Sequence, residues 1–339
     1  MEFIGQLDEQ QKKVQVDILD RKILFLLSKN ARYSESSIAS CLKISKEVVH
    51  YRIKRMQQEK FLTGFITVLN DQRLGKTVHA INLSLHPSPE HELLINRLVN
   101  DSHISNVKHY NSLLDLQFSV TTTSLSEFVQ FFDELMNHHH HLIKDYNIST
   151  ILSEQFMGLD FLLDGIEKPL IQEKKGSSFQ KEFQSAKTHL PLKLDDKDLA
   201  ILSALKLNAR LPILSISQSL HLSTTSVQNR IQQLIKTGAI KCFIPYISLS
   251  NLGYQWYTLH LRTKNLSQST FTQYVQQHPN IVWMTKRLGK WNYHLNMWVK
   301  NNTEFNKVVQ ELGHTFKDSI IAYDSSLVHK QYKFNQKVE

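Results

Sequence analysis

The side chains best suited to chemistry in this chain cluster on one face of a helix expected after Ser45. Val49, Ile53 and Met56 recur at i, i+4 and i+7 and predict a buried stripe. The opposite face then carries Lys46, Glu47, His50, Tyr51 and Lys54, with Arg52 and Arg55 beside it and Ser45 as the cap, and all eight are candidate DNA-binding residues. Lysine and arginine donate to phosphates and guanine edges, and histidine and tyrosine can contact either. This face therefore predicts contacts to the major groove of double-stranded DNA.

A second helix has the same buried spacing, at Val227, Ile231 and Leu234, but exposes a different set of side chains. That set is Thr224, Thr225, Gln228, Asn229 and Gln232, with Arg230 beside them. Glutamine and asparagine can pair with adenine, so this helix is expected to read bases with little support from charge. For either helix, the alternative is that these residues form only the solvated face of a packing helix.

Both helices belong to a long internal repeat. Asn30-Ala31-Arg32 returns as Asn208-Ala209-Arg210, and the same offset joins Asp20 to Asp198 and Phe65 to Phe243. Most matching positions fall at the spacing of a helical core. A module that keeps its packing residues while its surface changes is one fold used twice.

Each repeat predicts the same two-part architecture. Two short helices, a tight turn and a third capped helix describe a helix-turn-helix, followed by a short wing or strand. The second part alternates as β-α-β-β-α-β, the ferredoxin-like pattern. Apolar residues such as Leu116, Phe118, Leu295 and Met297 are expected on the sheet face without helices, which predicts packing against another sheet.

The fold class is therefore α+β, with two winged helix-turn-helix domains, each followed by a ferredoxin-like domain. The predicted boundaries are 12–68 and 193–246 for the helix-turn-helix domains, 76–163 and 254–336 for the ferredoxin-like domains, and 164–192 for a linker.

Composition narrows the function classes. A formal charge of +9 favours a polyanionic partner. No apolar run approaches the roughly 20 residues that span a bilayer, and the first residues lack a secretory apolar stretch, so a cytoplasmic location is expected. Cys41 and Cys242 occupy non-equivalent repeat positions, which argues against disulfides and a cysteine zinc site. His138 to His141 are interpreted as a solvated helix end rather than a metal site.

The first repeat resembles the Lrp/AsnC (feast/famine) family of transcription regulators. The resemblance rests on Asp20-Arg21-Lys22-Ile23-Leu24, Asn30-Ala31-Arg32, Ser45 and Arg52-Ile53-Lys54-Arg55, and the second repeat matches more loosely. It implies a winged helix-turn-helix domain joined to a ferredoxin-like domain, and a role in DNA-binding transcription regulation.

The same resemblance implies an amino-acid effector near a Gly-x-x-Asp turn between the second and third strands. The second repeat reads Gly289-Lys290-Trp291-Asn292, a partial match, which makes Gly289, Trp291 and Asn292 the candidate effector residues. The first repeat departs further, with Asn111-Ser112-Leu113-Leu114. Sensing of a small molecule is therefore expected, if at all, in the second repeat.

Family members with one unit dimerise through the ferredoxin-like sheets. Here residues 66–165 carry five Lys and Arg against twelve Asp and Glu, whereas residues 244–339 carry eleven against five. Opposite charges favour pairing the two different halves, so we hypothesise an intrachain pseudo-dimer that reads an imperfect inverted repeat. The alternative is a homo-oligomer in which identical copies pair.

No Ser/His/Asp, paired-carboxylate or phosphate-loop arrangement stands at a meaningful spacing, so the sequence predicts a non-enzyme with no catalytic residues, no metal and no cofactor. Two alternatives stay open. Paired Lrp-like units also occur in siroheme decarboxylases, and the stretch from Trp291 to Trp298 faintly resembles their aromatic strand, while His109-Tyr110 lies in the preceding strand of the first repeat. The other alternative is an interaction adaptor that has lost DNA binding.

Overall fold

The computed structural model describes residues 15–111, 116–171 and 190–334. The chain forms two compact units, and each contains a segment from either half of the sequence. Of the described residues, the helical unit contains 15–75, 162–171 and 190–248, and the barrel unit contains 76–111, 116–161 and 249–334. Most of the expected linker, at 172–189, lies outside the described residues. Among the described helices, none is long and apolar enough to cross a lipid bilayer.

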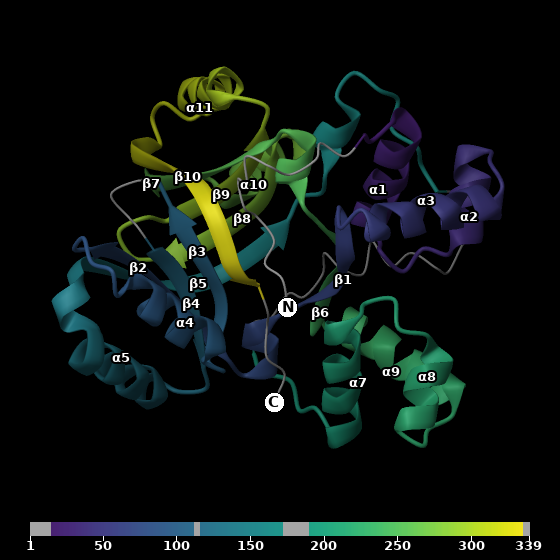
Figure 1. The fold of residues 1–339 in the computed structure, drawn as a ribbon, viewed down its shortest axis with the longest axis horizontal. Helices are drawn as coiled ribbons and strands as arrows, with labels where there is room; N and C mark the ends of the chain where they lie inside the picture. Colours follow the sequence, from purple (N-terminus) through teal and green to yellow (C-terminus); the bar gives the residue numbers. More distant parts are fainter. Residues whose placement is uncertain (1–14, 112–115, 172–189, 335–339) are drawn as a thin grey trace. The chain divides into compact units, whose positions relative to one another are not determined.

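The helical unit holds one three-helix module from each repeat (Figure 1). The modules are α1 (Ile18–Lys29), α2 (Glu35–Leu42) and α3 (Lys46–Gln58), and α7 (Asp196–Leu207), α8 (Ile213–Ser219) and α9 (Thr224–Lys236). Asp17, Ser34 and Ser45 begin the first three helices, each accepting a backbone N–H with its side-chain oxygen. Asp195 and Ser223 do the same for α7 and α9. Both modules are therefore helix-turn-helix units with equivalent caps on their first and third helices, whereas Pro212 precedes α8 without a side-chain cap.

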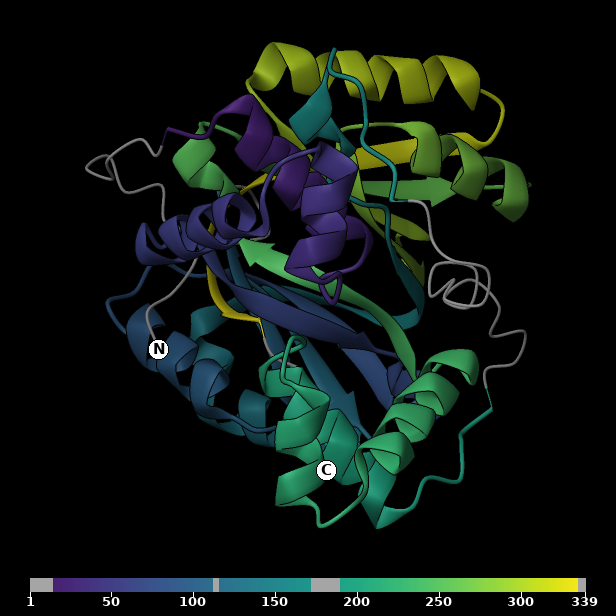
Figure 2. The ribbon, with the colours of Figure 1, turned by 90° about the vertical axis from the view of Figure 1, so that its right-hand side faces the viewer.

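The strand that follows each third helix pairs with its counterpart in the other repeat. β1 (Leu62–Leu69) and β6 (Ile240–Ile247) form an antiparallel two-stranded sheet, in which Thr67 lies opposite Phe243 and Phe65 opposite Pro245. Figure 2 shows the two strands side by side. The helical unit is consequently built around a contact between the two halves of the chain.

The barrel unit contains two β-α-β-β-α-β modules, as the alternation of the sequence predicts. The first consists of β2 (Thr77–Leu85), α4 (His91–Asn100), β3 (Ile104–Tyr110), β4 (Leu116–Thr122), α5 (Leu125–His139) and β5 (Ile143–Phe156). The second consists of β7 (Gln255–Thr263), α10 (Gln268–Gln277), β8 (Ile281–Leu288), β9 (Tyr293–Val299), α11 (Asn302–Thr315) and β10 (Ile320–Phe334). Short 3-10 turns occur at Asp71–Leu74, His140–Leu142, Asp160–Leu163 and Leu249–Leu252. The residues expected to begin β4, at 112–115, lie outside the described residues.

The two modules close into one barrel with the strand order β10-β3-β4-β2-β5-β8-β9-β7. The long last strand of each module makes the closure. β5 pairs with β2 and then crosses to β8, and β10 pairs with β7 and then crosses to β3. Closure leaves neither module with an unpaired sheet edge.

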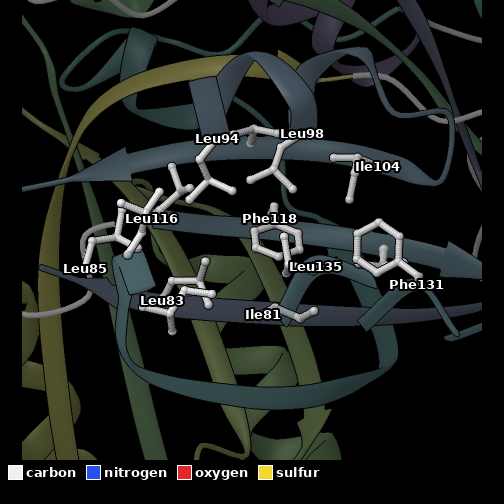
Figure 3. Packing of buried hydrophobic residues seen from close by; sticks show 14 of the residues in the cluster. Ile81, Leu83, Leu85, Leu94, Leu98, Ile104, Leu116, Phe118, Phe131 and Leu135 are labelled. Carbon is white, nitrogen blue, oxygen red and sulfur yellow. The ribbon is translucent and has the colours of Figure 1, made fainter. Parts of the chain in front are cut away.

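Each module keeps its own apolar core between its sheet and its helices. Leu94 and Leu98 of α4 and Phe131 and Leu135 of α5 pack on the sheet residues of the first module (Figure 3). Phe271, Phe305 and Leu312 of α10 and α11 do the same in the second. Every helix of the barrel unit therefore covers the outside of the barrel (Figure 1).

The expectation that Leu116, Phe118, Leu295 and Met297 line the face without helices was wrong. All four belong to the helix-covered cores. Successive side chains of a strand point to opposite faces, so the residues between them, such as Gln117, His294 and Asn296, point to the barrel interior instead. The two sheets face each other through polar side chains.

Candidate nucleic-acid interface

Helix α3 exposes the face that its sequence predicts. Val49, Ile53 and Met56 are buried. The residues turned to solvent on the other side are Ser45, Lys46, Glu47, His50, Tyr51 and Lys54. Tyr51 is 65% exposed, which is unusual for a large aromatic side chain and leaves its hydroxyl and ring available to a partner. His50 Nδ1 lies 3.1 Å from a carboxylate oxygen of Glu35 on α2.

Two of the predicted arginines on α3 are held by carboxylates at the start of α1. Arg52 donates to Asp17 at 2.7 Å and to Asp20 at 2.9 Å. Arg55 also binds Asp20, whose side chain is fully buried. Burial lowers the pKa of Arg52, but the hydrogen bonds that it donates to Asp17 and Asp20, together with their negative charges, outweigh burial and the net shift is upward. These contacts fix α3 against α1 and place its remaining side chains outward.

Helix α9 repeats this arrangement with fewer charges. Arg230, the equivalent of Arg52, binds Asp195 at 2.8 Å and Asp198 at 2.7 Å. The solvent-facing residues are Thr224, Thr225, Gln228, Asn229 and Gln232. Where α3 has Lys46 and Lys54, α9 therefore has neutral hydrogen-bonding side chains at equivalent positions.

The repeated Asn-Ala-Arg motif joins the two helix-turn-helix modules, a role that sequence reasoning missed. Ala31 N donates to Phe243 O, and Ala209 N donates to Phe65 O, both at 2.9 Å. The Arg32 guanidinium lies over the Phe243 ring at 5.6 Å. Reciprocal contacts of this kind make a local twofold relation between the modules.

The reciprocity extends to the remaining residues of the motif. Arg210 lies over the Phe65 ring at 5.0 Å, and Arg32 also donates to Ala209 O at 2.6 Å. Asn30 and Asn208 shape each turn by accepting the backbone N–H two residues on. The signal in the sequence was that the motif and Phe65/Phe243 return together at one offset.

The candidate effector residues lie in and after the β8–β9 turn. Gly289 has φ 151°, and a Cβ there would lie 2.9 Å from Cβ of Ser149, so glycine allows close packing of this turn against β5. The Asn292 side chain accepts from Thr263 N at 2.7 Å. Trp291 is half-buried with Lys290 over its ring. Effector binding by Gly289, Trp291 and Asn292 stays a prediction.

Comparison with known proteins identifies the helix-turn-helix modules. The AsnC-type helix-turn-helix domain matches at residues 16–57 and again at 194–235. The transcriptional regulator LrpC of Bacillus subtilis is 32% identical over 107 residues, which is 31% of this chain and 74% of LrpC. The chain belongs to the Lrp/AsnC family. The regulatory protein AsnC of Haemophilus influenzae is 24% identical over 130 residues, 36% of this chain and 87% of that protein.

A solved structure shares the fold across both repeats. The siroheme decarboxylase NirDL superposes with a TM-score of 0.61 at 13% identity, and the match covers 94% of each chain. This Lrp/AsnC chain thus has the paired architecture of an enzyme in addition to the helix-turn-helix domains of regulators.

The expectation that the chain is not an enzyme was wrong. It rested on the absence of familiar catalytic motifs, yet NirDL is an enzyme with the same paired fold. A protein with this paired fold can therefore be an enzyme, and the missing motifs do not exclude enzyme activity for this chain.

Proposed function

We propose that this chain is a DNA-binding transcription regulator that reads one duplex with two different helices, α3 and α9. The observation that carries the proposal is the pair of exposed polar faces, each on a helix-turn-helix module whose third helix is capped and held from behind. Third helices of this kind enter the major groove in helix-turn-helix proteins. The printed names of the relatives, a regulatory protein and a transcriptional regulator, agree with this role.

The exposed residues divide into two groups by their chemistry. Lys46 and Lys54 suit phosphate contacts, and His50 and Tyr51 suit base edges. On α9 the hydrogen-bonding side chains Gln228, Asn229 and Gln232 suit adenine, with Thr224 and Thr225 at the backbone. Arg52, Arg55 and Arg230 are engaged by carboxylates, so we assign them to positioning the two helices.

The joining of the two modules supports one operator for one chain. β1 and β6 pair within the chain, and the Asn-Ala-Arg contacts tie the modules reciprocally. Helices related by such a local twofold meet two half-sites in inverted orientation. Because α3 and α9 present different side chains, the proposed operator is an imperfect inverted repeat with a more strongly bound half.

Selection of bound fragments from a random DNA pool, with and without free amino acids, tests the proposal. We expect an enriched inverted repeat with unequal halves, and an affinity that falls steeply with salt. Lys54→Ala should weaken binding to all sequences and lower the salt slope by about 1. Lys307→Ala removes the same charge from exposed α11 of the barrel unit and should change neither. A strictly palindromic site would contradict the two-helix arrangement, and no salt-dependent affinity would favour an adaptor.

A second candidate function is that of a tetrapyrrole enzyme. The specific observation in its favour is the match to NirDL over 94% of the chain, together with a solved complex of NirDL with an iron-uroporphyrin III analogue. Buried histidines and cations inside the barrel would suit a ligand with several carboxylates. Titration with iron uroporphyrin decides this: a saturable shift of its Soret band supports the candidate, and an unshifted band at stoichiometric protein contradicts it.

A further inference from the structure

We propose that the interior of the closed barrel binds a small organic carboxylate between Lys108 and Arg287 on one side and the imidazoles of His260 and His294 on the other. This proposal is independent of DNA binding, since all four residues belong to the barrel unit. Eight-stranded barrels are just wide enough to be filled by side chains or to hold one small ligand.

Three of the four residues come from the neighbouring strands β8, β9 and β7 of the second module, and the fourth comes from β3 of the first. His260 of β7 lies directly opposite His294 of β9, and His294 lies opposite Thr285 of β8, two residues before Arg287. The ring centroids of His260 and His294 are 4.5 Å apart in a T-shaped arrangement. Lys108 comes from β3 of the other module, and its ammonium lies 4.3 Å from the Trp256 ring centroid. The cluster thus draws on both repeats.

The two histidines carry polar atoms that nothing described in the chain satisfies. Each is 1% exposed, and none of their four ring nitrogens has a hydrogen-bond partner among the described residues. Asn296 lies close enough to His294 to raise its pKa slightly, yet the geometry of a hydrogen bond is not met. Leaving a buried donor or acceptor without a partner costs about 1–3 kcal/mol, so such groups usually mark a bound water, ion or ligand.

Charge points to an anion as the missing partner. Lys108 and Arg287 are both buried, and the carboxylate of Glu154 favours the charge on each of them. Burial and the neighbouring Arg287 lower the pKa of Lys108 to about 7, and burial lowers that of Arg287 to about 10. A carboxylate ligand would favour the charged form of both side chains and accept from imidazole N–H groups.

Other polar side chains around the cluster form hydrogen bonds with one another. The two histidines differ from these neighbours in this respect. Trp256 Nε1 donates to the Asn296 side chain at 2.9 Å, and the Tyr110 hydroxyl donates to Gln117 Oε1 at 2.6 Å. These polar side chains have partners within the chain, whereas all four ring nitrogens of His260 and His294 lack a hydrogen bond among the described residues.

The other module shows what the same positions look like without imidazoles. Asn82 and Gln117 are paired across β2 and β4 as His260 and His294 are paired across β7 and β9. Both amides are buried. Because amides suffice to fill these positions in one module, the histidines of the other are not required by the barrel alone.

Binding is tested on the full chain with acetate, succinate and benzoate at constant ionic strength, using chloride as reference. The readouts are the histidine ring signals in NMR spectra and the melting temperature. We expect at least one carboxylate to shift the His260 and His294 signals saturably and to raise the melting temperature by several degrees. Uncharged succinamide should do neither.

Variants locate the site. His260→Asn and His294→Gln copy the residues of the first module, so both should fold, and each should abolish the carboxylate-induced rise in melting temperature. His314→Asn alters an exposed histidine on α11 and should retain it. Should either variant fail to fold, the wild-type ring signals alone decide.

Three results would overturn the proposal. One is the absence of any shift with all three carboxylates. Another is a rise in melting temperature that persists in both variants, which would indicate anion binding elsewhere. The third is binding of iron uroporphyrin alone, which would assign the carboxylate chemistry to a tetrapyrrole. DNA affinity measured without carboxylate reports separately on the proposed regulator.

Discussion

The two helix-turn-helix modules share their internal contacts and differ in what they expose. Arg52 and Arg230 stand at equivalent positions and bind carboxylates at the start of α1 and α7. On the outer face, Lys46 and Lys54 of α3 correspond to Thr224 and Gln232 of α9. One contact that holds each third helix in place, an arginine bound by carboxylates at the start of the first helix, is thus shared by both repeats, while the surface that would meet a partner is different. Differences between repeats are therefore a guide to function in this chain.

The sharpest way to break this comparison is to remove the carboxylate behind each helix. Asp20 is fully buried and binds both Arg52 and Arg55, whereas Asp198 is partly exposed and binds Arg230. Asp20→Asn should lower the free energy of unfolding by about 3 kcal/mol, since it removes the buried carboxylate that both arginines bind and leaves Arg52 with Asp17 alone. Asp198→Asn should cost about 1 kcal/mol. Urea denaturation measures the free energy of unfolding of both variants. Equal losses in the two variants would contradict the prediction that the buried carboxylate of Asp20 stabilises its module more than Asp198 stabilises the other.

Exchanging the charges of the two helices should affect DNA binding next. Lys46→Thr with Lys54→Gln gives α3 the neutral face of α9, and should weaken binding on the order of 10- to 100-fold and lower the salt slope by about 1.8. Thr224→Lys with Gln232→Lys gives α9 the charges of α3, and should strengthen DNA binding and raise the salt slope. Fluorescence anisotropy over a range of salt concentrations measures both exchanges. An unchanged slope in either exchange would contradict a phosphate-contacting role for these positions.

Much of this architecture is visible in the sequence, because repeated apolar spacing reports packing. Val49, Ile53 and Met56 are buried as their spacing predicts, and Ser45 caps the helix that it precedes. The roles of polar residues were harder to predict. Arg52 and Arg55 look like DNA contacts on a helical projection, but Asp17 and Asp20, some 35 positions away, hold them. A contact across that distance depends on how α1 packs, which spacing does not show.

The interior of the barrel was predicted least well, for a related reason. Strand alternation says that two faces differ but not which one meets the helices. Leu116 and Leu295 were assigned to the wrong face, so the polar interior that contains His260 and His294 was not predicted. The unusual feature in the sequence was His260 and His294 standing where the other repeat has Asn82 and Gln117.

A smaller effect is expected when the base-reading residues are exchanged. His50→Gln with Tyr51→Asn gives α3 the pair that α9 has at Gln228 and Asn229. Each base position read should lose about 1 kcal/mol of discrimination, and the two halves of the selected site should become more alike. Repeating the DNA selection with this variant measures the change. Equal weakening on all sequences would place these residues at the backbone instead.

The same comparison within the barrel predicts a modest dependence of stability on pH. Burial, then Arg287 and Lys108, lowers the pKa of His260 to about 3 from its ordinary value near 6.5, and burial lowers that of His294 as well. Between these values the unfolded chain binds protons that the folded chain does not, so stability falls as pH drops from about 6.5 towards 3. His260→Asn, which copies Asn82, should lessen the fall in melting temperature between pH 7 and pH 5, whereas His314→Asn at an exposed position should not. An identical fall in the melting temperature of wild type and His260→Asn would show that other groups set the acid sensitivity. The two halves of the interior would then differ in composition but not in how protonation changes stability.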